Sequence, residues 1–214
     1  MRAHYGHQHW WPGDTPLEIC VGAILTQNTN WKNVDKAIQN LKLHNALEMN
    51  TLHALPLVKM AELIRPAGYY NIKAQRLRSF TGYVGQHCGG KLDELFQGST
   101  SFVRKRLLEI KGIGPETADS MLLYAGNHAS FVIDAYTKRI FSRHGWCSSE
   151  VSYEELQLVC SHCLKLSPEL GADLIDYWQD YHAQLVNIGK DFCRKSSPLC
   201  NQCPLKSLLP KGGG

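Results

Sequence analysis

Apolar residues recur at helical spacing along almost the whole chain, and this pattern constrains the fold more than any other feature. Few stretches alternate apolar and polar residues as half-buried strands do, and no strand–helix–strand rhythm appears. We therefore predict an all-α protein of about ten helices joined by short loops. The segments with helical spacing are residues 16–25, 31–41, 57–64, 72–84, 92–96, 103–110, 116–124, 135–141, 153–164 and 170–188.

Composition limits the class of protein. The chain has 214 residues, of which 43% are hydrophobic, so it can bury one or two cores. No apolar run approaches the ~18 residues of a membrane helix, and the polar, His-rich start lacks the apolar segment of a signal peptide. We expect a cytoplasmic protein without membrane contact. The formal net charge of +4 suits a polyanionic partner but also an ordinary solvated surface.

The segment IKGIGPETADSML predicts a tight hairpin between two helices. Gly112 and Gly114 permit backbone angles and close approaches that a side chain would forbid, and Pro115 suits the first position of a helix. Free N–H groups at such a turn can hold a phosphate without reading a base. The alternative is that Gly-Ile-Gly is only a turn. The full frame, with an apolar helix on each side, favours the phosphate loop.

The hairpin and four other segments together resemble the endonuclease III superfamily of DNA base-excision glycosylases. These segments are PLEICVGAILTQNTNW, GYYNIKAQRL, FVIDAYTKRIFSR and a C-terminal C-x6-C-x2-C. The resemblance implies a two-lobed helix-hairpin-helix fold, with residues 20–131 as a six-helix lobe and residues 1–19 and 132–214 as the second lobe. It also implies a monomer that binds damaged double-stranded DNA in the nucleoid. The implied DNA contacts in the hairpin are Lys111, Gly112, Ile113, Gly114 and Thr117.

Two carboxylates are the catalytic candidates that the resemblance implies. Members with lyase activity carry a lysine, which forms a Schiff base, where this chain has Glu116. The chain is therefore similar to the monofunctional branch, since a carboxylate cannot form a Schiff base. Asp134 matches the family aspartate that stabilises an oxocarbenium-like sugar and activates water. The alternatives are an N-cap role for Asp134 and simple stabilisation of a first helical turn by Glu116.

Aromatic residues near the N-terminus suggest a pocket for a flipped base. Trp10, Trp11 and Pro12 stand in HWWPGD, and Trp31 ends QNTNW. This combination resembles the endonuclease-III-like 3-methyladenine DNA glycosylases. A 3-methylated adenine is cationic, and aromatic faces attract cations by ~0.5–2 kcal/mol. The alternative is that these tryptophans only cover the core.

Flipping a base requires a side chain to fill the hole left in the stack. By match to the family, the candidates are Gln27 in ILTQNTN and Tyr69 in AGYYNIKA. Gln27 could instead cap the following helix, and Tyr69 could pack in the core. We expect Lys73 to face phosphate or solvent.

The C-terminal cysteines, Cys193, Cys200 and Cys203, match three of the four cysteines that hold a [4Fe–4S] cluster in the family. Leu209 occupies the fourth position and cannot bind iron. A cluster with three cysteine ligands, vestigial cysteines and a displaced fourth ligand all remain open, and zinc would also need a fourth ligand. We favour a cluster that orders the loop with Arg194 and Lys195.

These features predict a monofunctional DNA N-glycosylase that flips alkylated purines such as 3-methyladenine and hydrolyses their glycosidic bonds, leaving an abasic site. The alternatives within the superfamily are an adenine glycosylase, for which the chain is short, and a pyrimidine-lesion glycosylase with AP lyase activity, against which Glu116 argues. A non-catalytic DNA-damage binder is the alternative from a different class. It would not depend on Asp134.

Overall fold

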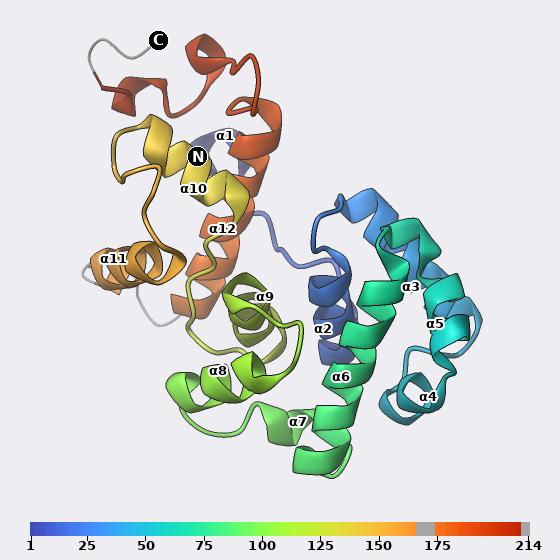
Figure 1. Cartoon of the computed structure of the whole chain (residues 1–214). Helices are drawn as coiled ribbons and strands as arrows, with labels where there is room; N and C mark the ends of the chain where they lie inside the picture. Colours follow the sequence, from blue (N-terminus) through green and yellow to red (C-terminus); the bar gives the residue numbers. More distant parts are fainter. Residues whose placement is uncertain (166–173, 211–214) are drawn as a thin grey trace. The chain divides into compact units, whose positions relative to one another are not determined.

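The computed structural model describes residues 1–165 and 174–210, and every regular element in these ranges is helical (Figure 1). The predicted all-α class is confirmed. The chain forms two compact units, which we call the hairpin unit (Trp11–His128) and the terminal unit (Met1–Trp10 with Ala129–Gly214). The lobe boundaries expected from the sequence, after residues 19 and 131, differ from these divisions. Each unit is described below by itself.

The hairpin unit is a bundle of short helices around the apolar helix α2. Its elements are α2 (Pro16–Leu25), α3 (Trp31–Leu43), α4 (Met49–Ala54), α5 (Leu57–Leu63), η1 (Arg65–Ala67), α6 (Tyr70–Cys88), α7 (Leu92–Leu95), α8 (Thr100–Glu109), α9 (Pro115–Ser120) and η2 (Met121–Ala125). Eight of the ten residues of α2 are buried, as expected for a helix that is apolar on all sides. Side chains of Thr15, Asn30 and Ser99 accept the N-capping hydrogen bonds of α2, α3 and α8.

The predicted continuous helix over residues 116–124 is wrong in its second half. The α-helical part α9 ends at Ser120, and the chain continues as the π-helical turn η2, in which Gly126 N–H donates to Met121 O at 2.9 Å. All five residues of η2 are buried. Tertiary packing in the core therefore sets this turn, which local apolar spacing could not reveal.

The terminal unit pairs α10 with the long helix α12. Its elements are α1 (Arg2–Tyr5), α10 (Ala135–Arg143), α11 (Tyr153–Lys165), α12 (Leu174–Asp191), η3 (Cys200–Gln202) and η4 (Lys206–Leu208). Gly189 lets the two helices approach closely, because an added Cβ would stand 2.3 Å from Cδ1 of Tyr136. The sequence predicted the last helix over residues 170–188; its start, residues 170–173, lies outside the described residues.

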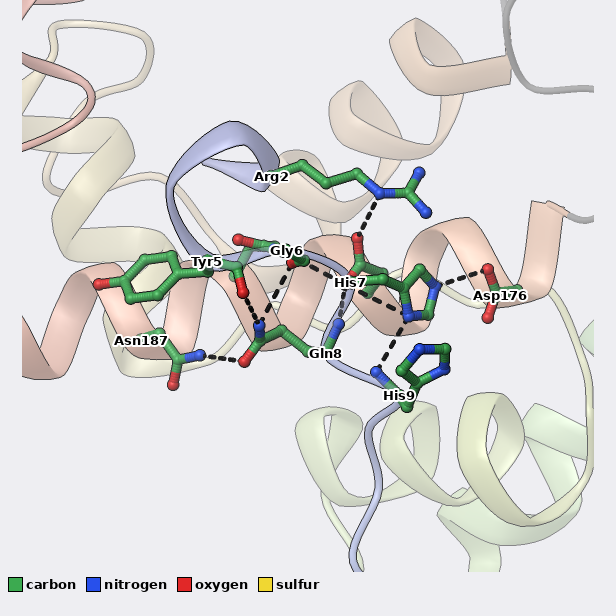
Figure 2. Close-up of polar contacts among 10 residues, drawn as sticks. Arg2, Tyr5, Gly6, His7, Gln8, His9, Asp176 and Asn187 are labelled. Carbon is green, nitrogen blue, oxygen red and sulfur yellow. Dashed lines mark hydrogen bonds and ion pairs between the residues drawn. The ribbon is translucent and has the colours of Figure 1, made fainter.

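The N-terminal segment lies along α12 and is fastened to it by polar contacts (Figure 2). His7 Nε2 lies 2.8 Å from Asp176 Oδ2, and Gln8 N–H donates to Asp180 Oδ1 at 2.8 Å. Asn187 donates to the Gln8 side chain at 2.7 Å. These contacts fix the segment that leads to the two adjacent tryptophans. Within the described ranges, no helix combines the length and apolarity needed to cross a bilayer.

Candidate functional site

The hairpin between α8 and α9 is a tight turn with exposed glycines. Ile113 N–H donates to Ile110 O at 3.0 Å, and the Ile113 side chain is buried, so Ile113 anchors the turn and exposes no side chain to a ligand. Gly112 has φ +93 and Gly114 has φ −96. In the described residues, the N–H groups of both glycines donate to no other protein atom, and both glycines are exposed. The turn therefore presents two unpaired N–H donors to solvent.

The two glycines differ in their backbone conformation and in what surrounds them. An added Cβ on Gly112 would lie 2.4 Å from Cγ of Arg76, in a left-handed backbone conformation that side chains avoid. Gly114 has extended backbone angles, and an added Cβ would meet nothing within 4 Å. Within the protein itself, nothing therefore excludes a side chain at position 114. Its open surroundings leave space in which a ligand can approach the backbone.

Gln27 is folded against the hairpin. Its Nε2 donates to Gly112 O at 3.1 Å and to Thr117 Oγ1 at 2.9 Å, and Arg76 donates to its Oε1. Thr117, which the sequence placed among the DNA contacts, is buried beneath this amide. Asn30 caps α3, so Gln27 does not cap the following helix. In the protein without DNA, Gln27 holds the shape of the hairpin.

A buried ion pair joins the helices on either side of the hairpin. Arg104 of α8 makes two parallel hydrogen bonds, at 2.9 and 3.0 Å, to the carboxylate of Asp119 in α9. The Asp119 side chain is fully buried, so removing its partner would leave an uncompensated charge. Arg104 therefore stabilises the packing of α8 against α9. Lys111 and Glu116 are exposed on the hairpin and in the first turn of α9.

Tyr69 lies at the tip of a turn before α6. Its side chain is 67% exposed, which excludes the alternative that it packs in the core. Its φ of +47 is in the left-handed region, an uncommon and costly conformation for a bulky residue. Such strain is often found where a side chain must point at a ligand. The position is suited to the wedge role, which stays a prediction.

Lys73 does not face phosphate or solvent, contrary to expectation. It is only 1% exposed, and its Nζ donates to Leu25 O at 2.9 Å and to Ala67 O at 2.8 Å. Burial lowers the pKa of Lys73 to about 8, and the charge of Arg76 adds to the shift. Lys73 therefore fastens the end of α2, which precedes Gln27, to the turn that carries Tyr69.

Aromatic rings gather in the hairpin unit. The ring of Trp11 lies 5.3 Å from that of Trp31, edge to face, and 4.7 Å from that of Tyr124. Tyr124 comes from η2 and was missed by the sequence, where it looked like one more apolar helix residue. Pro12 is exposed beside the cluster. Trp10 belongs to the terminal unit, where the Lys190 ammonium lies 5.5 Å from its ring centre.

Asp134 caps α10 and contacts a buried histidine. Its Oδ1 accepts the Thr137 N–H at 2.7 Å, and its Oδ2 lies 3.8 Å from His182 Nε2. Burial acts to raise the pKa of Asp134, but His182 and the Thr137 hydrogen bonds outweigh it and hold the pKa below its ordinary value. The side chain, 12% exposed, is thus kept ionised. The sequence missed His182, which is a single histidine on an otherwise unremarkable helix.

The C-terminal cysteines fit a cluster in part. All three line one pocket, and Leu209, at the family's fourth ligand position, lines it too. Arg143 Nη1 lies 3.4 Å from Cys193 Sγ, and Leu205 N–H lies 3.4 Å from Cys203 Sγ. Burial, together with the nearby Cys193 and Cys200, raises the pKa of the Cys203 thiol, while the hydrogen bond from Leu205 acts in the opposite direction.

Comparisons with known proteins agree with this fold. The family profile of the HhH-GPD superfamily base excision DNA repair proteins matches residues 21–165. A Methanocaldococcus jannaschii protein provisionally named a DNA repair glycosylase is 46% identical over 207 residues, which cover 96% of this chain and 90% of that protein.

Two solved structures extend the likeness to three dimensions. The H. pylori 3-methyladenine DNA glycosylase bound to 1,N6-ethenoadenine is 31% identical, with a TM-score of 0.71 over 85% of this chain and 87% of that one. A non-covalent endonuclease III–DNA complex is 21% identical, with a TM-score of 0.79 over 99% and 90% of the two chains, and shows the shared fold. With the hairpin between α8 and α9, these matches show that the chain belongs to the HhH-GPD superfamily of base excision DNA repair proteins.

Proposed function

We propose that the protein is a monofunctional DNA N-glycosylase that removes alkylated purines from double-stranded DNA as a monomer. The observation that carries the proposal is the state of Asp134, a largely buried carboxylate that His182 and Thr137 keep ionised. An ionised carboxylate is what cleavage of an N-glycosidic bond requires, since it stabilises the positive charge that develops on the sugar.

The hairpin supplies the grip on DNA in this proposal. The exposed N–H groups of Gly112 and Gly114 donate to one phosphate, and Lys111 adds positive charge beside it. Tyr69 fills the space left by the flipped nucleotide. Gln27, bound to Gly112 O, keeps the turn in the shape that binds the phosphate.

The aromatic cluster of Trp11, Trp31 and Tyr124 suits an electron-poor or cationic base. An alkylated purine that carries positive charge leaves with the electron pair of the glycosidic bond and becomes neutral, so it needs little help from an acid. Asp134 stabilises the oxocarbenium-like sugar and accepts a proton from the water that attacks C1′. The H. pylori relative, which is named a 3-methyladenine glycosylase, supports this substrate class.

Two positions of the hairpin unit argue against lyase chemistry. A lyase needs a free amine at the sugar carbon. Glu116 occupies the position that would carry this amine, and Lys73 is buried with two carbonyl partners. A cluster held by the C-terminal cysteines would order the adjacent loop and would take no part in bond cleavage.

The test is the release of bases from duplex DNA treated with a methylating agent. We expect mass spectrometry to detect free 3-methyladenine, and the strands to break only after alkali. Strand breaks before alkali, with a covalent complex trapped by borohydride, would contradict the monofunctional mode. Release of bases from methylated DNA that is undiminished in Asp134→Asn would contradict the role of Asp134.

A further inference from the structure

The pocket around the C-terminal cysteines contains one more side chain that can bind a metal. Apart from the cysteines, its lining residues are Arg143, His144, Phe192, Lys206 and Leu209. Arginine and a protonated lysine offer no lone pair, and phenylalanine and leucine have no donor atom. Histidine is a common ligand of iron and zinc. His144 is therefore the one candidate for a fourth ligand among the described residues that line this pocket.

The His144 ring is arranged as a metal-binding histidine would be. The residue is 6% exposed, and its Nδ1 lies 2.8 Å from Ile140 O, one turn back in α10. A carbonyl can only accept, so Nδ1 carries the proton and Nε2 carries the lone pair. The Trp146 ring, 4.6 Å away, packs against the imidazole. A backbone carbonyl that fixes the tautomer is the usual outer partner of a metal-bound histidine.

The Nε2 atom of His144 is buried, and in the described part of the protein it has no hydrogen-bond partner. Leaving a buried polar atom unpaired costs about 1–3 kcal/mol, so such an atom calls for a ligand.

We propose that His144, through Nε2, is the fourth ligand of a [4Fe–4S] cluster held by the C-terminal cysteines. His144 is the C-cap residue of α10 and precedes these cysteines in the chain, so it can replace the missing cysteine at Leu209 without any ligand after Cys203. Arg143, the last residue of α10, donates to Cys193 Sγ and to the carbonyls of Arg194 and Lys195, so the end of α10 is tied to one of the cysteines and to the loop that follows it.

A single zinc ion is the alternative occupant of this pocket, and it makes the stricter demand on the positions of its ligand atoms. Among the side chains that the structure describes, those of residues 1–162 and 174–210, no three of His, Cys, Asp or Glu converge as one metal ion requires. A single zinc ion draws its ligand atoms to within about 2.0–2.3 Å of one centre. In a [4Fe–4S] cluster each ligand binds a different iron, so the ligand atoms stand further apart.

The first test is spectroscopic and does not depend on glycosylase activity. The full chain is purified without oxygen and labelled with ¹⁵N-histidine. We expect about four iron atoms per chain. After reduction, we expect the cluster's electron paramagnetic signal to show hyperfine coupling to a histidine nitrogen. A protein that carries zinc, or no metal, overturns the proposal, as does a cluster without nitrogen coupling.

Substitutions then test whether the coupled nitrogen belongs to His144. His144→Cys should keep the iron, lose the nitrogen coupling and lower the reduction potential, because histidine ligands raise it. His144→Ala should lose iron, and the added change Leu209→Cys should restore it without the nitrogen coupling. Leu209→Ala alone, which removes no donor from the pocket, is the matched control and should keep both iron and coupling. Full iron with unchanged coupling in His144→Cys would refute the assignment.

Discussion

Replacing Gly114 by alanine should weaken DNA binding without destabilising the free protein. Gly114 has extended backbone angles that alanine adopts readily, and the added methyl group would meet nothing within 4 Å. Alanine also restricts the unfolded chain, so the free energy of unfolding should rise by about 0.4–1 kcal/mol. The methyl group would, however, stand at the exposed turn that a phosphate must approach. Losing one hydrogen bond to a charged group costs about 1.5–3 kcal/mol, which is roughly a 10- to 150-fold loss of affinity.

Gly112→Ala should, in contrast, destabilise the free protein. Its φ of +93 is strained for alanine by about 1–2 kcal/mol. The new Cβ would also stand 2.4 Å from Arg76 Cγ and displace the arginine from Gln27. A lost hydrogen bond to a charged donor adds about 1.5–3 kcal/mol. The sum, about 2.5–5 kcal/mol, should lower the melting temperature by roughly 5–20 °C.

The assay pairs thermal melting with fluorescence anisotropy on a duplex that contains an uncleavable abasic-site analogue, at one fixed salt concentration. Gly85→Ala is the matched control, because Gly85 is exposed within α6 and an added Cβ there meets nothing within 4 Å. The control should gain about 0.5–1 kcal/mol of stability and bind DNA like the wild type. If Gly114→Ala binds as tightly as this control, the hairpin backbone does not hold the phosphate.

Four further substitutions test single side chains. Asp134→Asn keeps an oxygen that can cap α10, so the stability of the variant and its binding of the abasic analogue should change little. Its single-turnover rate of base release should fall by about 10²–10⁴-fold. Undiminished release would exclude a catalytic role for Asp134. His182→Leu removes the partner that lowers the pKa of Asp134 most, so burial should raise this pKa. The acid limb of the single-turnover pH–rate profile should then move to higher pH. An unmoved limb would mean that His182 does not act on Asp134. The native pKa of Lys73 is about 8 and its unfolded value is about 10.4, so the unfolded chain binds more protons between these two pH values. The free energy of unfolding of the wild type should therefore rise by up to about 3 kcal/mol from the lower to the higher pH. Denaturant titrations of Lys73→Met at the same two pH values should show no such rise. Tyr69→Gly should relieve backbone strain and keep the melting temperature at least as high, yet slow base release on methylated duplex; an unchanged rate would remove Tyr69 from base flipping.

Local rules in the sequence account for most of the helices and their starts. Apolar spacing predicted the central helix α2, and Thr15, Asn30 and Asp134 cap helices as short polar side chains do. The short helices α1 and α4 were missed, because α1 buries none of its residues and α4 buries only Leu52, so neither shows an apolar face in the sequence. The π-helical turn η2 was missed for another reason, since only packing in the core decides where the helix widens.

The candidate site could be predicted as a set of segments but not as a set of contacts. The hairpin follows from the order of glycine, proline and apolar residues, which is local. The partners of Gln27, Asp134 and the C-terminal cysteines come from distant parts of the chain, and no spacing in the sequence identifies Arg76, His182 or His144. These distant partners determine whether a candidate side chain is exposed, whether it is ionised, and whether it is already hydrogen-bonded within the protein.

Lys73 shows why the contacts of a residue, and not only its place in a sequence segment, matter for mechanism. From the sequence alone, it is a basic residue near Tyr69 and was expected to face phosphate or solvent. In the fold it is a buried cation at the carboxyl end of α2, where the helix dipole and the Leu25 carbonyl favour positive charge. Its second bond, to Ala67 O, fixes the turn in which Tyr69 holds its strained conformation. Strain of this kind persists only if the surroundings enforce it. Lys73→Met should therefore slow base release through Tyr69, without touching DNA, and Tyr69→Gly should make excision insensitive to the loss of Lys73.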